Sequence, residues 1–466
     1  MAPKDAFHLI DGAPDALPLH PVSKDGLADW LGARPAHQRA WIERTGFKAE
    51  PGSTLTLPDT RGTLAGIAVG VEAADHADRG LWSYAGLPDA LPPGTYRIDA
   101  PLEREAATRA ALGWAFGTYA FSRYKARKGE LPDLVWPEAA DRGFVRAAAE
   151  ATALARDLIN TPAADLGPGD LAAAARAVGE RFGATITVIS GDDLLTQNYP
   201  AVHAVGRASA KPPCLIDLRW GAATDPKVTL VGKGVCFDSG GLDIKPSTGM
   251  KLMKKDMGGA ATVLALASMV MATGLKVRLR LMIPAVENMI AGNAMRPLDV
   301  LSTRKGLTVE VGNTDAEGRL ILCDALAEAD TEQPVLMIDC ATLTGAARVA
   351  LGPELPVVFT RQDALAEELS RHGTAEADPV WRLPLWPGYR RLLDTKTADL
   401  SSTGDSPHAG AITAALFLSE FVSKDTNWVH LDMMAWNNRA RAGRPEGGEP
   451  QALRALYRLV AARARA

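Results

Sequence analysis

Residues 228–231 read VTLV, residues 260–272 read AATVLALASMVMA, and residues 277–284 read VRLRLMIP. The first and last runs are short and mostly apolar, which is typical of strands buried on both faces. The middle run is long enough for a helix and contains neither Gly nor Pro. Together the three runs predict two strands with a helix between them, which is the repeating pattern of α/β folds.

The same alternation continues on both sides of these runs. Further strands are expected at residues 185–189, 215–218, 335–338 and 428–431. Further helices are expected at residues 143–158, 169–181, 316–329 and 411–421. This order predicts an α/β fold whose mostly parallel sheet is covered by helices on both faces. Active sites in such sheets collect where strands end and loops begin.

The first part of the chain has a different character. It alternates short strand-like pieces, such as residues 64–71, with helical ones, such as residues 106–119, and has no recognisable catalytic signature. We expect a smaller N-terminal α/β domain at residues 1–130. The charged, Pro-containing and aperiodic residues 131–142 are the predicted linker, and residues 143–466 the catalytic domain.

Composition excludes several classes of protein. The chain has 466 residues, 51 Lys and Arg against 55 Asp and Glu, and a net charge of −4, which gives no general electrostatic reason to bind nucleic acid. The apolar content of 47% is too high for a disordered chain. The longest weakly polar run, residues 260–275, is shorter than the roughly 20 residues that span a bilayer, so no membrane partner is expected.

The cysteines and the N-terminus both indicate a cytoplasmic protein. Residues 1–14 include Lys4, Asp5 and Asp11 where a secretory leader has its apolar core, so no leader is expected. The cysteines form no CxxC pair and lie in apolar stretches, which predicts buried free thiols at positions 214, 236, 323 and 340.

Carboxylates and cations gather in four segments at the predicted ends of strands and helices. Asp339–Gly345 (DCATLTG) leaves a strand and forms one of them. The other three contain, among their charged residues, Lys233, Asp238, Lys245, Asp256, Asp315, Glu317 and Arg319. Each also has a simpler interpretation. Asp256 could cap its helix, Thr314 and Glu317 could form a capping box, and Lys233 could be a solvated lysine at the end of a strand.

The residue types of this cluster suit divalent metal ions. Oxygen-rich ligand sets bind Mg, Mn or Zn, and four carboxylates (positions 238, 256, 315 and 317) balance the charge of two such ions. A lysine can join only as a neutral amine, when a metal competes with its proton. Two adjacent metals would hold a hydroxide between them and polarise a carbonyl group. Lys245 and Arg319 would remain as cations for a developing oxyanion.

The motifs VGKGVCFDSGGLDIKP, KKDMGG, NTDAEGRL and DCATLTGA closely resemble those of the leucyl aminopeptidase family, the M17 metallopeptidases. The resemblance covers roughly residues 145–440 and is weak over the first ~130 residues, where the family has a macro-like α/β domain. It implies a cytosolic homohexamer that removes N-terminal residues from peptides with two Zn or Mn ions per subunit.

The resemblance also implies roles for individual residues. One metal would be bound by Lys233, Asp238, Asp256 and Glu317, and the other by Asp238, Asp315 and Glu317. Lys245 would stabilise the tetrahedral intermediate, and Arg319 would hold a bicarbonate-like anion that shuttles a proton. Substrate contacts are implied for Met253, Thr342, Leu343 and Gly345.

Some features depart from the family or lie outside its motifs. After the strand at 428–431 the chain lacks the family's longer stretch of small residues, so no leucine preference is predicted. Asp243 is an extra carboxylate beside Lys245 and is expected to be a solvated loop acid. His408, just before a predicted helix, is expected to be a capping or structural residue.

Two other functions remain compatible with the sequence. A non-catalytic oligomeric scaffold or nucleic-acid-binding relative would keep the fold, but it should carry a basic stripe that the net charge does not indicate. A two-metal phosphoesterase would use the same ligands, but neither GxGxxG nor GxxxxGK[ST] occurs in the Gly-rich segment around Val231.

Overall fold

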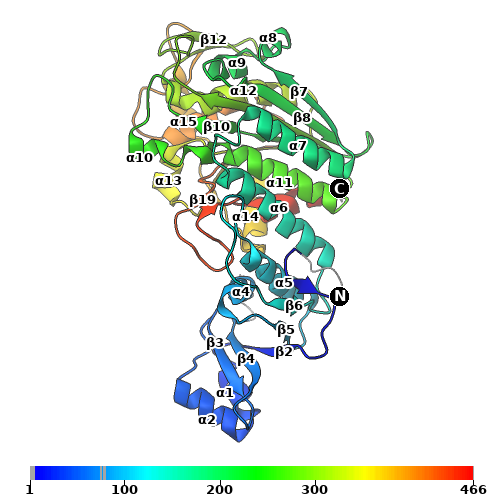
Figure 1. The fold of residues 1–466 in the computed structure, drawn as a ribbon. Helices are drawn as coiled ribbons and strands as arrows, with labels where there is room; N and C mark the ends of the chain where they lie inside the picture. The colour runs from blue at the N-terminus through cyan, green and yellow to red at the C-terminus, as the bar shows by residue number, and fades with distance from the viewer. Residues whose placement is uncertain (1–5, 74–75, 77–79, 465–466) are drawn as a thin grey trace. The chain divides into compact units, whose positions relative to one another are not determined.

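The computed structural model describes residues 6–73, 76 and 80–464, drawn in Figure 1. The chain forms two compact units, one of residues 1–153 with 439–446 and one of residues 154–438 with 447–466. The predicted linker 131–142 contains β6 (Asp133–Val135), which pairs with two strands of the N-terminal sheet. The domain boundaries stay a prediction. Residues 1–5 belong to the N-terminal stretch in which no secretory leader is expected, and they lie outside the described residues.

The first unit contains a six-stranded sheet in its described part, in the order β1-β6-β5-β2-β4-β3. The strands are β1 (Leu9–Ile10), β2 (Leu17–Val22), β3 (Thr54–Pro58), β4 (Leu64–Gly70), β5 (Thr95–Ile98) and β6. The helices are α1 (Leu27–Gly32), α2 (Ala36–Thr45), α3 (Leu81–Ala85), α4 (Leu87–Ala90) and α5 (Arg104–Thr118), and α6 (Arg142–Asn160) follows. The predicted strand at 64–71 and helix at 106–119 are confirmed as β4 and α5.

The second unit is built on a sheet in the order β16-β15-β18-β14-β9-β11-β8-β7, with β10 paired to β11. Its strands are β7 (Thr185–Ser190), β8 (Cys214–Trp220), β9 (Lys227–Gly232), β10 (Gly234–Asp238), β11 (Arg278–Asn288), β14 (Leu336–Ala341), β15 (Val357–Phe359), β16 (Trp381–Arg382) and β18 (Trp428–Asp432). The central strands β18, β14, β9, β11 and β10 pair in parallel. The antiparallel pairs involve β7, β8 and β15, so the mostly parallel sheet is confirmed.

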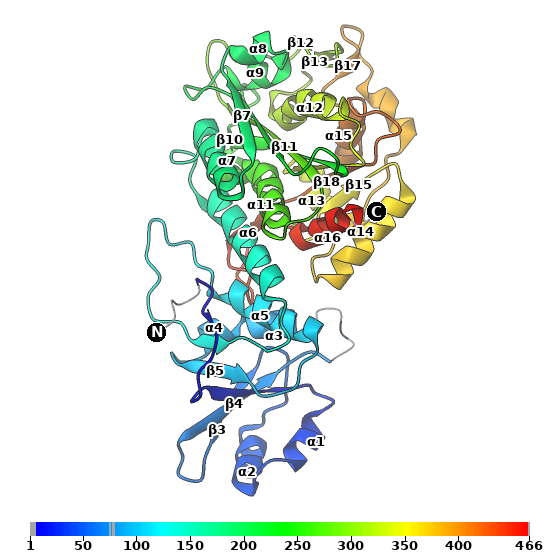
Figure 2. The same ribbon diagram turned by 90° about the vertical axis from the view of Figure 1, so that its right-hand side faces the viewer.

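Helices cover both faces of this sheet (Figures 1 and 2). The central helices, α11 (Gly258–Ala272) and α12 (Glu317–Asp330), both pack on β9, β11 and β14. The α11 face also carries α7 (Pro168–Phe182) and α16 (Leu453–Arg463), and the α12 face carries α9 (Pro200–Gly206) and α15 (Gly410–Ser419). Because apolar side chains surround α11, its residues from Gly258 to Met271 are buried throughout.

The remaining elements complete the unit. They are α8 (Asp193–Thr196), α10 (Ser247–Met250), η1 (Met253–Met257), β12 (Val300–Ser302), β13 (Thr308–Glu310), η2 (Thr314–Ala316), α13 (Gly345–Leu351), α14 (Asp363–Ala375), η3 (Pro387–Leu393), β17 (Leu400–Ser401), β19 (Trp436–Asn437) and β20 (Gly447–Gly448). The four cysteines are free and buried, as predicted. Among the described residues, every helix is too short or too polar to cross a bilayer.

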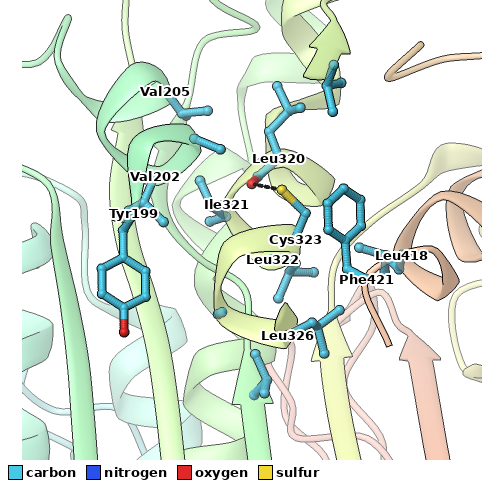
Figure 3. Packing of buried hydrophobic residues seen from close by; sticks show 14 of the residues in the cluster. Tyr199, Val202, Val205, Leu320, Ile321, Leu322, Cys323, Leu326, Leu418 and Phe421 are labelled. Atoms are coloured by element: carbon cyan, nitrogen blue, oxygen red, sulfur yellow. Dashed lines mark hydrogen bonds between the residues drawn. The ribbon is translucent and has the colours of Figure 1, made fainter. Parts of the chain in front are cut away.

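A large core cluster of this unit includes the buried side of α12 (Figure 3). Leu320, Leu322 and Leu326 of α12 meet Val202 of α9 and Phe421, which follows α15. All five residues are 0% exposed. This packing holds α12 against the sheet, and with it the first turn of the helix, where Glu317 and Arg319 lie.

Replacement of Leu326 by Ala is expected to lower the free energy of unfolding by about 2–5 kcal/mol, because it removes apolar contacts and leaves a cavity that close packing cannot fill. Denaturant unfolding of both proteins measures the difference. Leu195→Ala is the matched control, since Leu195 is 49% exposed. A loss below about 1 kcal/mol for Leu326→Ala would show that the cavity collapses.

Candidate metal centre

The candidate site lies where the parallel strands end. Asp238 is the last residue of β10, Asn288 the last of β11 and Asp432 the last of β18, while Lys233 follows β9 and Thr342 follows β14. Carboxyl ends of parallel strands share one edge of a sheet, so these side chains converge there. Asp256 comes from η1, Asp315 from η2, Glu317 and Arg319 from the first turn of α12, and Lys245 from the loop after β10.

Lys233 is buried between two carboxylates. Its Nζ lies 2.7 Å from Asp256 Oδ2 and 2.9 Å from Glu317 Oε1, and it donates to the Thr342 carbonyl at 3.0 Å. A side chain at Gly318 would clash with Lys233, since an added Cβ would lie 2.6 Å from its Cε. Lys233 is 3% exposed, so the solvated lysine considered above is wrong.

Lys245 is the second cation of the site. Its Nζ lies 2.8 Å from Asp238 Oδ2 and also pairs with Asp315. Burial disfavours the charge on both lysines, but the surrounding carboxylates outweigh it and raise the pKa of each. Lys233 would therefore have to give up a strongly held proton before it could bind a metal ion.

The carboxylates form a compact group. Asp238, Asp315 and Glu317 each offer an oxygen within 4.8 Å of the others. Burial, followed by the repulsion of neighbouring carboxylates, raises the pKa of Asp238 to about 6 and that of Glu317 to about 7, and burial raises the pKa of Asp315. These shifts show that the group is costly to keep fully ionised unless further positive charge is supplied.

One buried carboxylate oxygen of Glu317 indicates that the group lacks a positively charged partner. Glu317 Oε2 is buried and accepts no hydrogen bond from the described residues. Buried polar atoms are nearly always paired, and a buried carboxylate oxygen without a donor, on a residue of a carboxylate group, is a typical metal ligand. The residues at this site therefore fit a divalent cation. Neither Thr314–Glu317 capping nor Asp256 capping is observed, because Thr314 Oγ1 donates to Gly240 and Asp256 Oδ1 accepts from Thr342 Oγ1 at 2.8 Å.

Arg319 lies on α12, two residues beyond Glu317. It is 7% exposed, and burial lowers its pKa to about 10. Its Nη1 donates to the Ser402 carbonyl at 2.7 Å, whereas its Nε has no partner among the described residues. Arg319 is thus a fixed buried cation with donor capacity left for an anion.

The four predicted substrate residues lie around the same strand ends. Met253 begins η1 and is half-buried, and Thr342 holds Asp256 as described above. Leu343 follows Thr342, and Gly345 begins α13. A Cβ at Gly345 would meet only Arg348 Nη2 at 3.7 Å, so there is open space beside this residue.

Several residues that shape the site were not singled out from the sequence. Asp432 accepts from the Leu343 and Thr344 amides at 3.0 and 3.2 Å and from Thr344 Oγ1 at 2.6 Å. Asn288 donates to Asp238 Oδ1 at 2.9 Å. The only sequence signal for either was its position at a strand end, because their partners are far away in the chain.

The expectations for Asp243 and His408 have different outcomes. Asp243 is exposed, as expected, but its carboxylate also accepts a hydrogen bond from the Thr314 amide at 2.7 Å. The expected capping role of His408 is wrong, since α15 has Ala409 as its N-cap residue with no side-chain cap bond and His408 is exposed. The left-handed conformation of Ala409 turns the chain into the helix instead.

Family models match both parts of the chain. The catalytic domain of the cytosol aminopeptidase family matches residues 153–457, and the N-terminal domain of M17 aminopeptidases matches residues 17–137. A probable cytosol aminopeptidase of Xanthobacter autotrophicus is 40% identical over 431 residues, which cover 86% of this chain and 85% of the relative. One from Rhizobium rhizogenes is 42% identical over 347 residues, covering 71% and 69%.

Solved structures agree over nearly the full length. The cytosol aminopeptidase of Coxiella burnetii is 47% identical, with a TM-score of 0.93 and coverage of 97% of this chain and 98% of that one. The bottromycin maturation enzyme BotP in complex with Mn is 35% identical, with a TM-score of 0.87 and coverage of 97% and 100%. The chain therefore belongs to the M17 cytosol aminopeptidase family, and it is a metallopeptidase with aminopeptidase activity.

Proposed function

We propose that this protein hydrolyses the N-terminal residues of peptides with two divalent metal ions bound at the carboxylate cluster. The observation that carries the proposal is the buried, unpaired Glu317 Oε2 beside Asp238 and Asp315. Lys233, Asp238, Asp256 and Glu317 would hold one ion, and Asp238, Asp315 and Glu317 the other. Zn and Mn both suit these ligands, and BotP is a relative with Mn bound.

When bound, the two ions would activate a water molecule and polarise the scissile carbonyl group. Lys245 would stabilise the oxyanion that forms, since its Nζ already lies at the carboxylate group. Arg319 would hold a bicarbonate-like anion that carries the proton of the attacking water, because its guanidinium is buried and only partly paired. The Leu343 carbonyl would contact the substrate, and Met253, Thr342 and Gly345 would line the pocket for its N-terminal side chain.

The proposal extends to the assembly and the compartment. We infer a cytoplasmic homohexamer, in line with the resemblance and with the names of the relatives. Exposed Trp381 and Trp386, 59% and 58% accessible, support a surface that another subunit covers. A scaffold or nucleic-acid-binding role has less support, because the charged residues needed for catalysis are all present and converge.

A substrate comparison tests this function. The protein loaded with Mn or Zn is expected to hydrolyse an aminoacyl anilide and to leave an aryl phosphate intact, since the site offers oxyanion donors but no phosphate cradle. Prior removal of metal with a chelator should abolish the activity, and metal addition should restore it. Turnover of the phosphate without turnover of the anilide would favour the phosphoesterase.

A further inference from the structure

Two loops that carry the proposed metal ligands are joined by a reciprocal pair of hydrogen bonds. The Asp243 amide donates to Thr314 Oγ1 at 2.8 Å, and the Thr314 amide donates to Asp243 Oδ2 at 2.7 Å. Asp243 lies in the loop between Asp238 and Lys245, while Thr314 directly precedes Asp315. Thr314 is 0% exposed, and Asp243 Oδ2 is the acceptor of its amide in the folded chain.

The contact between the loops is close enough to require glycine. Thr314 Oγ1 donates to the Gly240 carbonyl at 2.6 Å, and a Cβ at Gly241 would lie 3.0 Å from Thr314 Oγ1. Gly240 and Gly241 have φ values of 88° and 66°, which other residues rarely adopt. The backbone of this loop therefore presses directly on Thr314.

Asn288 completes the connection from the sheet. Its Nδ2 donates to Asp238 Oδ1 at 2.9 Å and to the Thr314 carbonyl at 3.1 Å. The amide, the carbonyl and the hydroxyl of Thr314 are thus all held, by Asp243, Asn288 and Gly240. We call Asp243, Asn288 and Thr314 the clasp.

We propose that Asp243 is a positioning residue that sets metal affinity by holding the Asp315 loop against the Asp238 loop. The inference rests on the proposed function, in which Asp238 and Asp315 are ligands. Carboxylates that must meet around a cation repel one another, so their loops need an independent connection that keeps them together. Partners that orient metal ligands typically change metal affinity by about 10–100-fold when they are removed.

The solvent exposure of Asp243 determines how strongly the loss of its side chain should weaken metal binding. Water can reach the carboxylate and partly replace it as the acceptor for the Thr314 amide. Removal of the side chain is therefore expected to weaken metal binding by about tenfold, at the lower end of that range. The overall fold should remain, because the other two contacts of Thr314 do not involve the Asp243 side chain.

Three variants distinguish the loss of the hydrogen bond in the clasp from the loss of a negative charge and from a general effect on stability. Asp243→Ser removes the carboxylate Oδ2 that accepts from the Thr314 amide and leaves only a hydroxyl one bond closer to the backbone. Asp243→Asn removes the same charge but keeps an oxygen that can accept from the Thr314 amide. Asp399→Ser is the matched control, because Asp399 and Thr308 form the same reciprocal pair, at 2.8 and 3.0 Å, and neither residue belongs to the carboxylate group.

The measurement is a calorimetric titration of the chelator-stripped full chain with Mn²⁺, together with its thermal unfolding without metal. Asp243→Ser should bind about tenfold more weakly, while Asp243→Asn and Asp399→Ser should stay within about twofold of the parent. The unfolding temperature of metal-free Asp243→Ser should be close to that of the metal-free parent. Unchanged affinity in Asp243→Ser would overturn the inference, as would equal losses in Asp243→Ser and Asp243→Asn, because the latter result points to charge alone.

A fourth protein, Asp315→Ala, distinguishes failure of the inference from failure of the proposed function. If Asp315→Ala loses Mn²⁺ and Asp243→Ser does not, the ligand assignment holds and the clasp fails. If Asp315→Ala binds Mn²⁺ as tightly as the parent, the proposed ligand set itself fails.

Discussion

Glu317→Ala is expected to abolish metal binding at both positions and, with it, aminopeptidase activity. Glu317 is proposed to contact both ions, it is 1% exposed, and its Oε2 has no other partner among the described residues. Asp238 and Asp315 already belong to the proposed ligand set, so neither provides a replacement for the lost carboxylate. Metal content by elemental analysis and turnover of an aminoacyl anilide measure the two effects.

The controls for Glu317→Ala address folding and charge. Lys233 keeps Asp256 at 2.7 Å when Glu317 is removed, so its charge is still paired and the fold should persist by circular dichroism. Glu367→Ala removes an exposed glutamate of α14 and should leave metal content and turnover unchanged. A full metal complement in folded Glu317→Ala would show that the unpaired oxygen is not a ligand.

Lys245→Ala is expected to retain metal but to lower kcat by about 10²-fold or more, as the loss of an oxyanion donor does. The proposed ligands of each ion do not include Lys245, so its removal leaves the ligand set intact. The ion pairs of Lys245 with Asp238 and Asp315 also place it within reach of the developing charge. Steady-state kinetics and metal analysis on the same preparation separate the two roles.

The comparison for Lys245→Ala is Lys251→Ala, which removes an exposed lysine at the end of α10. It should keep parental kcat and metal content. Metal loss in Lys245→Ala would mean that the lysine supports the ligands rather than the intermediate. An unchanged kcat with full metal would remove Lys245 from the proposed mechanism altogether.

Much of the second unit could be predicted from local patterns. Its buried parallel strands are continuous apolar runs, and α11 is apolar on every side, so burial alone reveals both. The charged residues of the site could also be identified from the sequence, because Asp238, Asp256 and Glu317 interrupt apolar stretches at the ends of helices and strands. Their types and spacing, together with the family motifs, were enough to propose a ligand set.

Local patterns misled where a side chain had a distant partner. Thr314 and Glu317 have the spacing of a capping box, yet Thr314 Oγ1 donates to Gly240, 74 residues away. Asp256 precedes a helix like a capping residue, yet its carboxylate pairs with Lys233 and accepts from Thr342. In both cases the folded sheet provides a partner that competes with the local hydrogen bond, and periodicity contains no information about it.

The sequence by itself determined which elements form and which charged residues stand at their ends, because hydrophobic burial and motif spacing are properties of neighbouring residues. Only the tertiary structure decided how those charges are paired. The ion pair of Lys233 with Glu317, the hydrogen bond from the Leu343 amide to Asp432 and the one from the Thr314 amide to Asp243 join residues 71 to 89 positions apart, and the ion pair of Lys233 with Asp256 joins residues 23 positions apart. Hydrogen bonds and ion pairs act over a few ångströms, so their partners are known only once the chain has folded.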